Sequence, residues 1–103
     1  MNENKLMSLL GLAQKARKVA SGELAVESAV RAGKAGLILL ARDASDNAKK
    51  NYRDLAAHYR VECEELLTKE QLGNCTGKAP RAALALLDEG FRSAVKKLLN
   101  EEK

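Results

Sequence analysis

Aromatic and histidine residues are scarce in this sequence, and their scarcity excludes two classes of protein. The chain contains two tyrosines, one phenylalanine, no tryptophan and one histidine. RNA-binding modules that stack bases on a sheet need aromatic side chains paired on a strand, and Tyr52, Tyr59 and Phe91 show no such pairing. His58 lies among lysines and arginines without a catalytic partner, so we interpret it as an ordinary surface or half-buried residue. We therefore expect neither a base-stacking sheet nor an enzyme.

Metal ligands and phosphate-binding glycine motifs are also lacking. Cys63 and Cys75 are too far apart for a CxxC motif, and no histidine cluster accompanies them, so we expect reduced thiols. Glu62, Glu64 and Glu65 crowd one predicted strand without histidine or aspartate at ligand spacing, which favours a solvated edge over a metal site. No Walker-type or dinucleotide-binding fingerprint occurs. We predict no metal and no cofactor.

No long hydrophobic run is present. The apolar stretch from Leu6 to Ala13 is short and precedes basic residues, the reverse of the order in a signal peptide, and no segment approaches the length of a membrane span. We expect a cytoplasmic protein with no membrane partner. With 103 residues, 46% hydrophobic and 31% charged, the chain should form one globular domain over residues 1–103. The net charge of +4 favours an anionic partner, although such a charge also serves solubility alone.

Hydrophobic spacing predicts helices alternating with short strands. Helices are expected over about 4–16 and 23–32, from a cap at Ser45 through Tyr59, from the T-x-x-Q capping box at Thr68 to Gly73, and over a last amphipathic segment around residues 91–99. Strands are expected at 19–20, 37–41, 61–67 and 82–87, with a loop over 74–80 and a solvated tail over 100–103. This alternation predicts an α/β protein, a three-layer α/β/α sandwich around a small central sheet.

The stretch from Lys15 to Gly36 carries the strongest functional signal. Three cations, Lys15, Arg17 and Lys18, precede Ser21 and Gly22, where the second predicted helix begins. A helix N-terminus presents unpaired N–H groups and the positive end of a dipole, so cations beside it would form a site for a phosphate backbone. This pattern favours an RNA-binding module.

Several strings, in order, resemble a known family. LLGLAQKARKVASGE (9–23), LILLARDAS (37–45) and TKEQLGNCTGKAPR (68–81) resemble the kink-turn-binding ribosomal proteins of the L-seven-Ae type, most closely their small bacterial YlxQ-like members. The resemblance spans nearly the whole chain. It implies a four-stranded mixed sheet and binding to a kink-turn, a sharply bent RNA internal loop, in ribosomal or other structured RNA.

Binding in that family uses the N-terminus of the second helix and the loop before the last strand, which packs against a flipped-out nucleotide. By position, Gly22 matches the glycine that opens the recognition helix, Asp43 the acidic residue after the buried strand, and Gly77 the frame of the loop. Together with the cations in and near these segments, the resemblance predicts the following RNA-binding residues: Lys15, Arg17, Lys18, Ser21, Gly22, Glu23, Leu24, Ala25, Ser28, Lys34, Asp43, Gly77, Lys78, Ala79, Pro80 and Arg81.

The sequence departs from the family at its base readers. The family pattern G-x-N-E-x-x-K has Leu24, Ala25 and Ser28 at its three polar positions here. Helical geometry points Leu24 away from the apolar stripe, which leaves two interpretations: an exposed leucine or one covering the adjacent loop, or a leucine that packs on a sugar or base. We expect shape and backbone contacts to dominate, and we favour a monomer. A protein-interaction module on the same fold is the main alternative, and a small phosphate-ligand binder is a weaker one.

Overall fold

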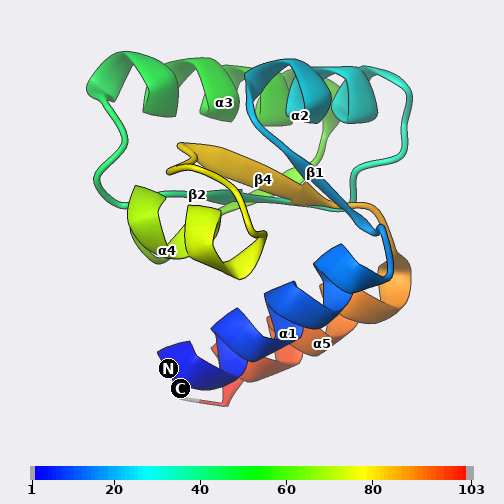
Figure 1. The fold of residues 1–103 in the computed structure, drawn as a ribbon. Helices are drawn as coiled ribbons and strands as arrows, with labels where there is room; N and C mark the ends of the chain where they lie inside the picture. The colour runs from blue at the N-terminus through cyan, green and yellow to red at the C-terminus, as the bar shows by residue number, and fades with distance from the viewer. Residues whose placement is uncertain (1, 102–103) are drawn as a thin grey trace.

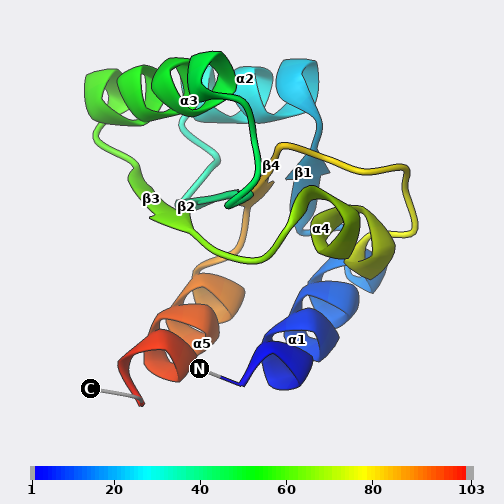
Figure 2. The ribbon, with the colours of Figure 1, turned by 90° about the vertical axis from the view of Figure 1, so that its left-hand side faces the viewer.

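The computed structural model describes residues 2–101 and confirms the predicted α/β/α sandwich (Figure 1). Helices and strands alternate in the order α1 (Glu3–Lys15), β1 (Val19–Ser21), α2 (Glu23–Arg31), β2 (Leu37–Leu40), α3 (Asp46–Tyr59), β3 (Glu62–Glu65), α4 (Lys69–Cys75), β4 (Ala83–Leu86) and α5 (Glu89–Asn100). Helices α2 and α3 cover one face of the sheet, and α1, α4 and α5 cover the other, as Figures 1 and 2 both show.

The sheet is mixed, and its strand order explains the composition of each strand. The order is β1-β4-β2-β3; β4 runs antiparallel to both of its neighbours, and β2 pairs with β3 in parallel. The two central strands, LILL and ALAL, are buried at every position, because helices cover both faces of the sheet. With leucines of α1 and valines of α2 they form an aliphatic core. The edge strands β1 and β3 are only half-buried.

Three of the predicted boundaries differ from those in the structure. Helix α4 does not end at Gly73 but continues through Cys75, and the buried Thr76 hydroxyl then donates to the carbonyls of Leu72 and Gly73. The strand predicted over 61–67 is shorter, because the buried Leu67 has a left-handed backbone with φ 61°. In the predicted tail, Asn100 belongs to α5, and residues 102–103 lie outside the described part of the chain.

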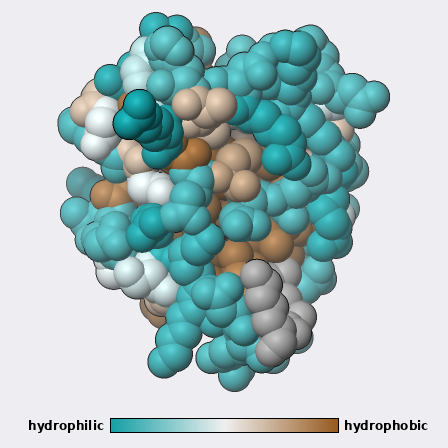
Figure 3. All heavy atoms as spheres, turned by 180° about the vertical axis from the view of Figure 1, so that it is seen from behind, coloured by the Kyte–Doolittle hydropathy of each residue, from teal (hydrophilic) through white to brown (hydrophobic). Residues whose placement is uncertain are grey.

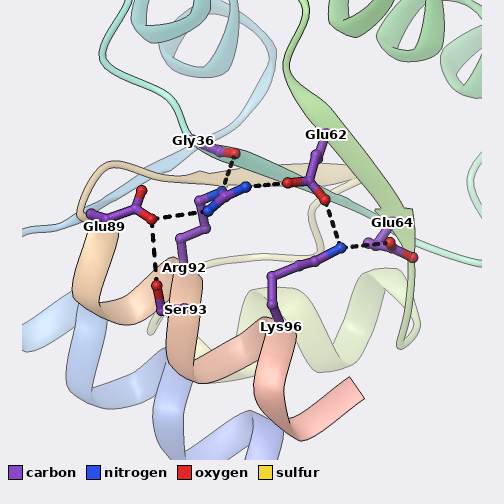
Figure 4. Close-up of polar contacts among 7 residues, drawn as sticks. All are labelled: Gly36, Glu62, Glu64, Glu89, Arg92, Ser93 and Lys96. Atoms are coloured by element: carbon purple, nitrogen blue, oxygen red, sulfur yellow. Dashed lines mark hydrogen bonds and ion pairs between the residues drawn. The ribbon is translucent and has the colours of Figure 1, made fainter. Parts of the chain in front are cut away.

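The glutamates of β3 are not a solvated edge as predicted but the centre of an ion-pair network. On one face of the sheet, Arg92 and Lys96 of α5 pair with Glu62, and Lys96 also reaches Glu64 (Figure 4). On the other face, Lys49 and Arg53 of α3 pair with Glu65 at 2.8 and 2.5 Å. The network fastens one helix of each outer layer to the edge strand, because alternate side chains of a strand point to opposite faces.

The surface on the β3 side is correspondingly polar. Figure 3 views the molecule from behind Figure 1, and hydrophilic side chains dominate this face, with apolar atoms recessed between them. An edge strand lined with charged side chains is poorly suited to pairing with a strand of another chain. The charged side chains thus disfavour the addition of another strand at the β3 edge.

Candidate nucleic-acid interface

The N-terminus of α2 differs from the other helix starts in residues 2–101. Side chains of Asn2, Ser45, Thr68 and Asp88 accept hydrogen bonds at the starts of α1, α3, α4 and α5. Helix α2 begins at Gly22, with φ 94°, and no side chain caps it. The first bond along the helix runs from the Val26 N–H to the Gly22 carbonyl, at 2.9 Å. The N–H groups of residues 23–25 thus have no acceptor within residues 2–101 and remain available to an anion.

Arg81 lies beside this N-terminus. A Cβ atom built on Gly22 would stand 3.8 Å from Arg81 Nε, so the guanidinium stem covers the glycine. Both Arg81 Nε and the neighbouring Ser21 Oγ are buried, and neither has a hydrogen-bond partner within residues 2–101. Unsatisfied buried polar atoms are uncommon in folded proteins, and two of them gather where an anion would bind. We name Ser21, Gly22, the N–H groups of residues 23–25 and Arg81 the α2 N-terminal site.

The loop that carries Arg81 is fixed to α4. The Lys78 N–H donates to the Gly73 carbonyl at 2.9 Å, and the Arg81 N–H donates to the Lys69 carbonyl at 3.1 Å. The loop backbone passes so close to Gly73 that a Cβ there would lie 2.5 Å from the Ala79 carbonyl oxygen. Gly77 supplies a turn with φ 66°. The predicted loop residues Gly77, Lys78, Ala79 and Pro80 are all exposed on this scaffold.

Asp43 has a structural role at the same end of the sheet. Its Oδ1 accepts a 2.8 Å hydrogen bond from the Lys69 N–H, so the carboxylate supports the start of α4. The Ala41 N–H donates to the Ala82 carbonyl at 2.8 Å, which joins the end of β2 to the beginning of β4. Asp43 is therefore near the Arg81 loop, and α4 already uses one of its carboxylate oxygens.

Helix α2 directs its predicted readers to solvent. Val26, Ala29 and Val30 are buried, whereas Leu24, Ala25 and Ser28 are exposed. The helical spacing of Ala25, Val26, Ala29 and Val30 predicts one apolar stripe, and the exposure of Ala25 shows that it is not part of it. Leu24 is 84% exposed, so it is neither part of the core nor a cover for the adjacent loop.

A groove of about 790 Å³ runs between α2 and α3 and opens beside Arg81. Its near end is lined by Gly22, Ser45, Asn47, Pro80 and Arg81. Ser45 and Asn47 are not among the residues predicted from the sequence. The only signal for them is the pairing of β2 with β4, which brings the start of α3 to the loop.

Carboxylates and a tyrosine also line this groove. Glu23 and Glu27 of α2 lie opposite Tyr52 of α3. Burial, with the nearby charges of these two glutamates, raises the pKa of the Tyr52 phenol above its ordinary value. The phenol is thus a neutral hydrogen-bonding group at physiological pH. At the Gly22 end of the groove, the Glu23 carboxylate opposes an anion and Arg81 favours it.

The predicted cations do not all gather at the α2 N-terminus. Arg81 lies beside it, and Lys78 belongs to the same loop before β4. Lys18 lies at the other end of β1, where its carbonyl accepts from the Leu87 N–H at 2.8 Å, and Lys15 and Arg17 belong to the same turn. Lys34 follows the C-terminus of α2. The expectation that residues 15–18 flank the helix start is wrong, because β1 separates them from Gly22.

Residues 2–101 contain neither a metal-binding cluster nor a membrane-spanning helix. No group of three or more histidine, cysteine, aspartate or glutamate residues among them could hold a metal ion. None of the helices described is long and apolar enough to cross a membrane.

Comparison with known proteins places this geometry in a family. The chain is 37% identical over 98 residues to the "RNA-binding protein YlxQ" of Enterococcus faecium, covering 95% of this chain and 94% of that protein. It is 40% identical over 92 residues to the Bacillus subtilis (strain 168) protein of the same name, covering 89% and 92%.

Solved structures share the fold. A Bacillus halodurans C protein of unknown function superposes with a TM-score of 0.85 at 33% identity, covering 91% of this chain and 95% of that chain. The Giardia lamblia 15.5kD RNA binding protein shares the fold, with a TM-score of 0.77 at 17% identity over 96% and 85% of the two chains. The profile of the Ribosomal protein L7Ae/L30e/S12e/Gadd45 family matches residues 4–96, and the chain belongs to this family.

Proposed function

We propose that this protein binds structured RNA at a kink-turn-like bend, through the α2 N-terminal site and the loop before β4. Family membership and the printed names of the YlxQ relatives support RNA as the partner. The observation that carries the proposal is the uncapped start of α2 beside an arginine whose Nε has no partner within residues 2–101. Such a start stabilises a phosphate through N–H groups and the helix dipole, and Arg81 adds charge and directional donors.

The groove next to this site suits the second feature of a bend, an unstacked nucleotide. A phosphate held at residues 23–25 would place its nucleotide at the near end of the groove, between Pro80 and the start of α3. Ser45 and Asn47 there carry hydroxyl and amide groups that can bond to base edges. RNA recognition commonly uses bases that leave the stack, because their edges are then accessible.

Leu24 gives the site an apolar contact in place of a polar reader. The side chain is 84% exposed and belongs to the first turn of α2, next to the uncapped N-terminus. Packed against a ribose or a base face, the Leu24 side chain would be shielded from water, which favours binding without reading base identity. We therefore propose recognition of bent shape with weak base specificity, together with a cytoplasmic, non-enzymatic role.

A titration tests the proposal directly. A kink-turn RNA and a straight duplex of equal length and charge are titrated with the protein at several salt concentrations. We expect the kink-turn to bind more tightly than the duplex. Rising salt weakens the electrostatic attraction to both RNAs equally, so the difference in affinity should persist. Equal and steeply salt-dependent affinities would reduce the interaction to charge alone. Absence of binding to both would refute RNA as the partner.

A leucine pair provides the matched control. Leu24→Ser should weaken kink-turn binding by about fivefold to tenfold, the effect of losing one partly buried apolar contact. Leu12→Ser alters another leucine, 57% exposed on α1, and should leave affinity unchanged. Equal affinities for the two variants would show that Leu24 does not touch RNA.

Leu24 also supports a second candidate, a protein-interaction surface. An exposed apolar side chain on a helix can pack into an apolar groove of another protein. If both RNAs fail to bind while Leu24→Ser abolishes a protein contact, the fold serves that function instead.

A further inference from the structure

Four cations form a second exposed group, away from the α2 N-terminal site. We name Lys15, Arg17, Lys18 and Lys34 the far cation group; all four are exposed. None of them forms an ion pair with a carboxylate of residues 2–101. In the same part of the chain Lys49, Arg53, Arg92 and Lys96 are each paired with a glutamate. The far cation group is thus charge that the fold itself does not use.

Backbone hydrogen bonds place the far cation group at one end of the sheet. The Lys18 carbonyl accepts a hydrogen bond from the Leu87 N–H. Gly36 comes two residues after Lys34, and its N–H donates to the Leu86 carbonyl at 2.9 Å. Both segments therefore flank the carboxyl end of β4, one on each side of the strand. The first acidic residues after the carboxyl end of β4 are Asp88 and Glu89. Asp88 caps α5 by accepting from the Phe91 N–H, and Glu89 pairs with Arg92. Neither carboxylate is paired with a member of the far cation group.

The far cation group shares one side of the molecule with the α2 N-terminal site. Strand β1 is an edge strand, and in Figure 2 α2, β1 and α1 all lie on the right, at this edge of the sheet, with α2 above the sheet and α1 below it. Lys18 and Gly22 are four residues apart along this strand, which corresponds to about 13 Å at about 3.3 Å per residue. One extended ligand can therefore touch both regions, whereas a single nucleotide cannot.

We infer that the far cation group binds the phosphate backbone of a duplex arm that leaves the RNA bend. This inference rests on the proposed function and extends it from the bend to the flanking stem. An A-form RNA strand advances about 3 Å per nucleotide along the helix axis, so about 13 Å corresponds to about four nucleotide steps. The arm would run along the β1 edge from the α2 N-terminus toward Lys18. Contacts of this kind position a nucleic acid and carry no base information.

The test combines charge removal in the protein with charge removal in the RNA. The far variant carries Lys15→Gln, Lys18→Gln and Lys34→Gln; the control variant carries Lys5→Gln, Lys50→Gln and Lys97→Gln, with the same net charge. Each is titrated with a kink-turn RNA with two arms of about ten base pairs, a length that extends beyond the about 13 Å span. Two further RNAs carry uncharged methylphosphonate linkages from about the fourth pair outward, in one arm or the other.

The inference predicts a specific coupling. The far variant should bind the unmodified RNA about tenfold more weakly than wild type and with a shallower salt dependence, whereas the control variant should match wild type. Neutralising one of the two arms should weaken wild-type binding and abolish the difference between wild type and the far variant.

Other outcomes would overturn it. The inference fails if the far variant matches wild type, if the control variant weakens equally, or if the tenfold loss persists with both modified RNAs. In each of these cases a preference for the kink-turn over a straight duplex would leave the proposed function standing. If wild type binds none of the RNAs, the proposed function fails and the inference fails with it.

Discussion

The two edges of the sheet use charge in opposite ways. At the β3 edge, basic side chains of α3 and α5 converge on Glu62, Glu64 and Glu65, and the charges neutralise one another. At the β1 edge, the α2 N-terminal site and the far cation group present N–H groups and cations without carboxylate partners in residues 2–101. The exception there is Arg31, which pairs with Glu27 at 3.0 Å.

This difference separates stability from binding within one small fold. Exposed ion pairs contribute little individually, but several around one strand hold the outer layers together. Unpaired cations contribute nothing to folding, and their mutual repulsion opposes it slightly, yet they provide affinity for an anion. Changes at the β3 edge should therefore alter stability, and changes at the β1 edge should alter binding.

The largest effect is expected from substitution of Gly73, because this residue contributes both to the stability of α4 and to the position of the RNA-binding loop. Alanine in a helix normally gains up to about 1 kcal/mol over glycine. At Gly73 the added Cβ would lie 2.5 Å from the Ala79 carbonyl oxygen, so the loop backbone must move. We expect Gly73→Ala to destabilise the protein by about 1–3 kcal/mol and to weaken RNA binding, measured by urea unfolding and titration.

Gly11→Ala is the matched control. Gly11 is also helical, but its Cβ would meet only the Cys75 carbonyl oxygen, at an ordinary 3.7 Å. This variant should be stabilised by about 0.5–1 kcal/mol and bind as wild type does. Equal stability of the two variants would show that the loop does not press on α4.

Arg81 should affect binding alone. Arg81→Gln removes a cation and a buried Nε that has no partner in residues 2–101, so unfolding stability should stay level or rise. Kink-turn affinity should fall about tenfold, as for loss of a charge-assisted contact. A clear loss of stability with full affinity would contradict the separation of the two edges.

Arg92 should affect stability alone. Its side chain pairs with Glu62 and Glu89 and donates to the Gly36 carbonyl at 3.1 Å. Arg92→Gln should lower the thermal unfolding midpoint. RNA affinity should change by less than about twofold, because Glu62 and Glu89 already neutralise the charge of Arg92. Reduced affinity at an unchanged midpoint would refute this assignment.

The smallest effect is expected in the acid range. Hydrogen bonds from Lys96 and then Arg92 hold the pKa of Glu62 below its ordinary value, and Lys49 and Arg53 do the same for the pKa of Glu65. Because these pKa values are lowered on folding, the carboxylates stabilise the protein above their unfolded pKa, and this contribution is lost as pH falls.

A double variant measures this acid contribution. Glu62→Gln with Glu65→Gln should be less stable at pH 7 and should lose less stability than wild type below about pH 4.5. Parallel curves of unfolding free energy against pH for the two proteins would show that these glutamates make no such contribution.

The sequence predicts the architecture well because the determinants are local. The buried runs LILL and ALAL, the cap at Ser45 and the capping box at Thr68 each identify an element without reference to the rest of the chain. The sandwich follows from the alternation of these elements. The shortened β3 depends on the backbone of one residue, Leu67, and no pattern in the sequence predicts it.

The candidate site is less predictable, since it depends on strand order. Lys18 and Gly22 are close in the sequence but lie at opposite ends of β1, whereas Gly22 and Arg81 are far apart in the sequence and in contact. The pairing of β1 with β4 decides both facts. The roles of Glu62 and Glu65 likewise require the positions of α3 and α5. Neighbours in the sequence were thus a poor guide to neighbours in space.

The uncapped start of α2 provides backbone amides whose hydrogen exchange reports on ligand binding. Backbone amides without acceptors exchange their hydrogens with solvent rapidly, whereas those in the middle of a helix are protected. Leu24 and Ala25 provide two such amides, and each gives a separate signal in an NMR spectrum. Any anion that occupies this end of the helix must slow exchange at these amides first. Their exchange rates can therefore locate a bound ligand on the unmodified chain before any residue is replaced.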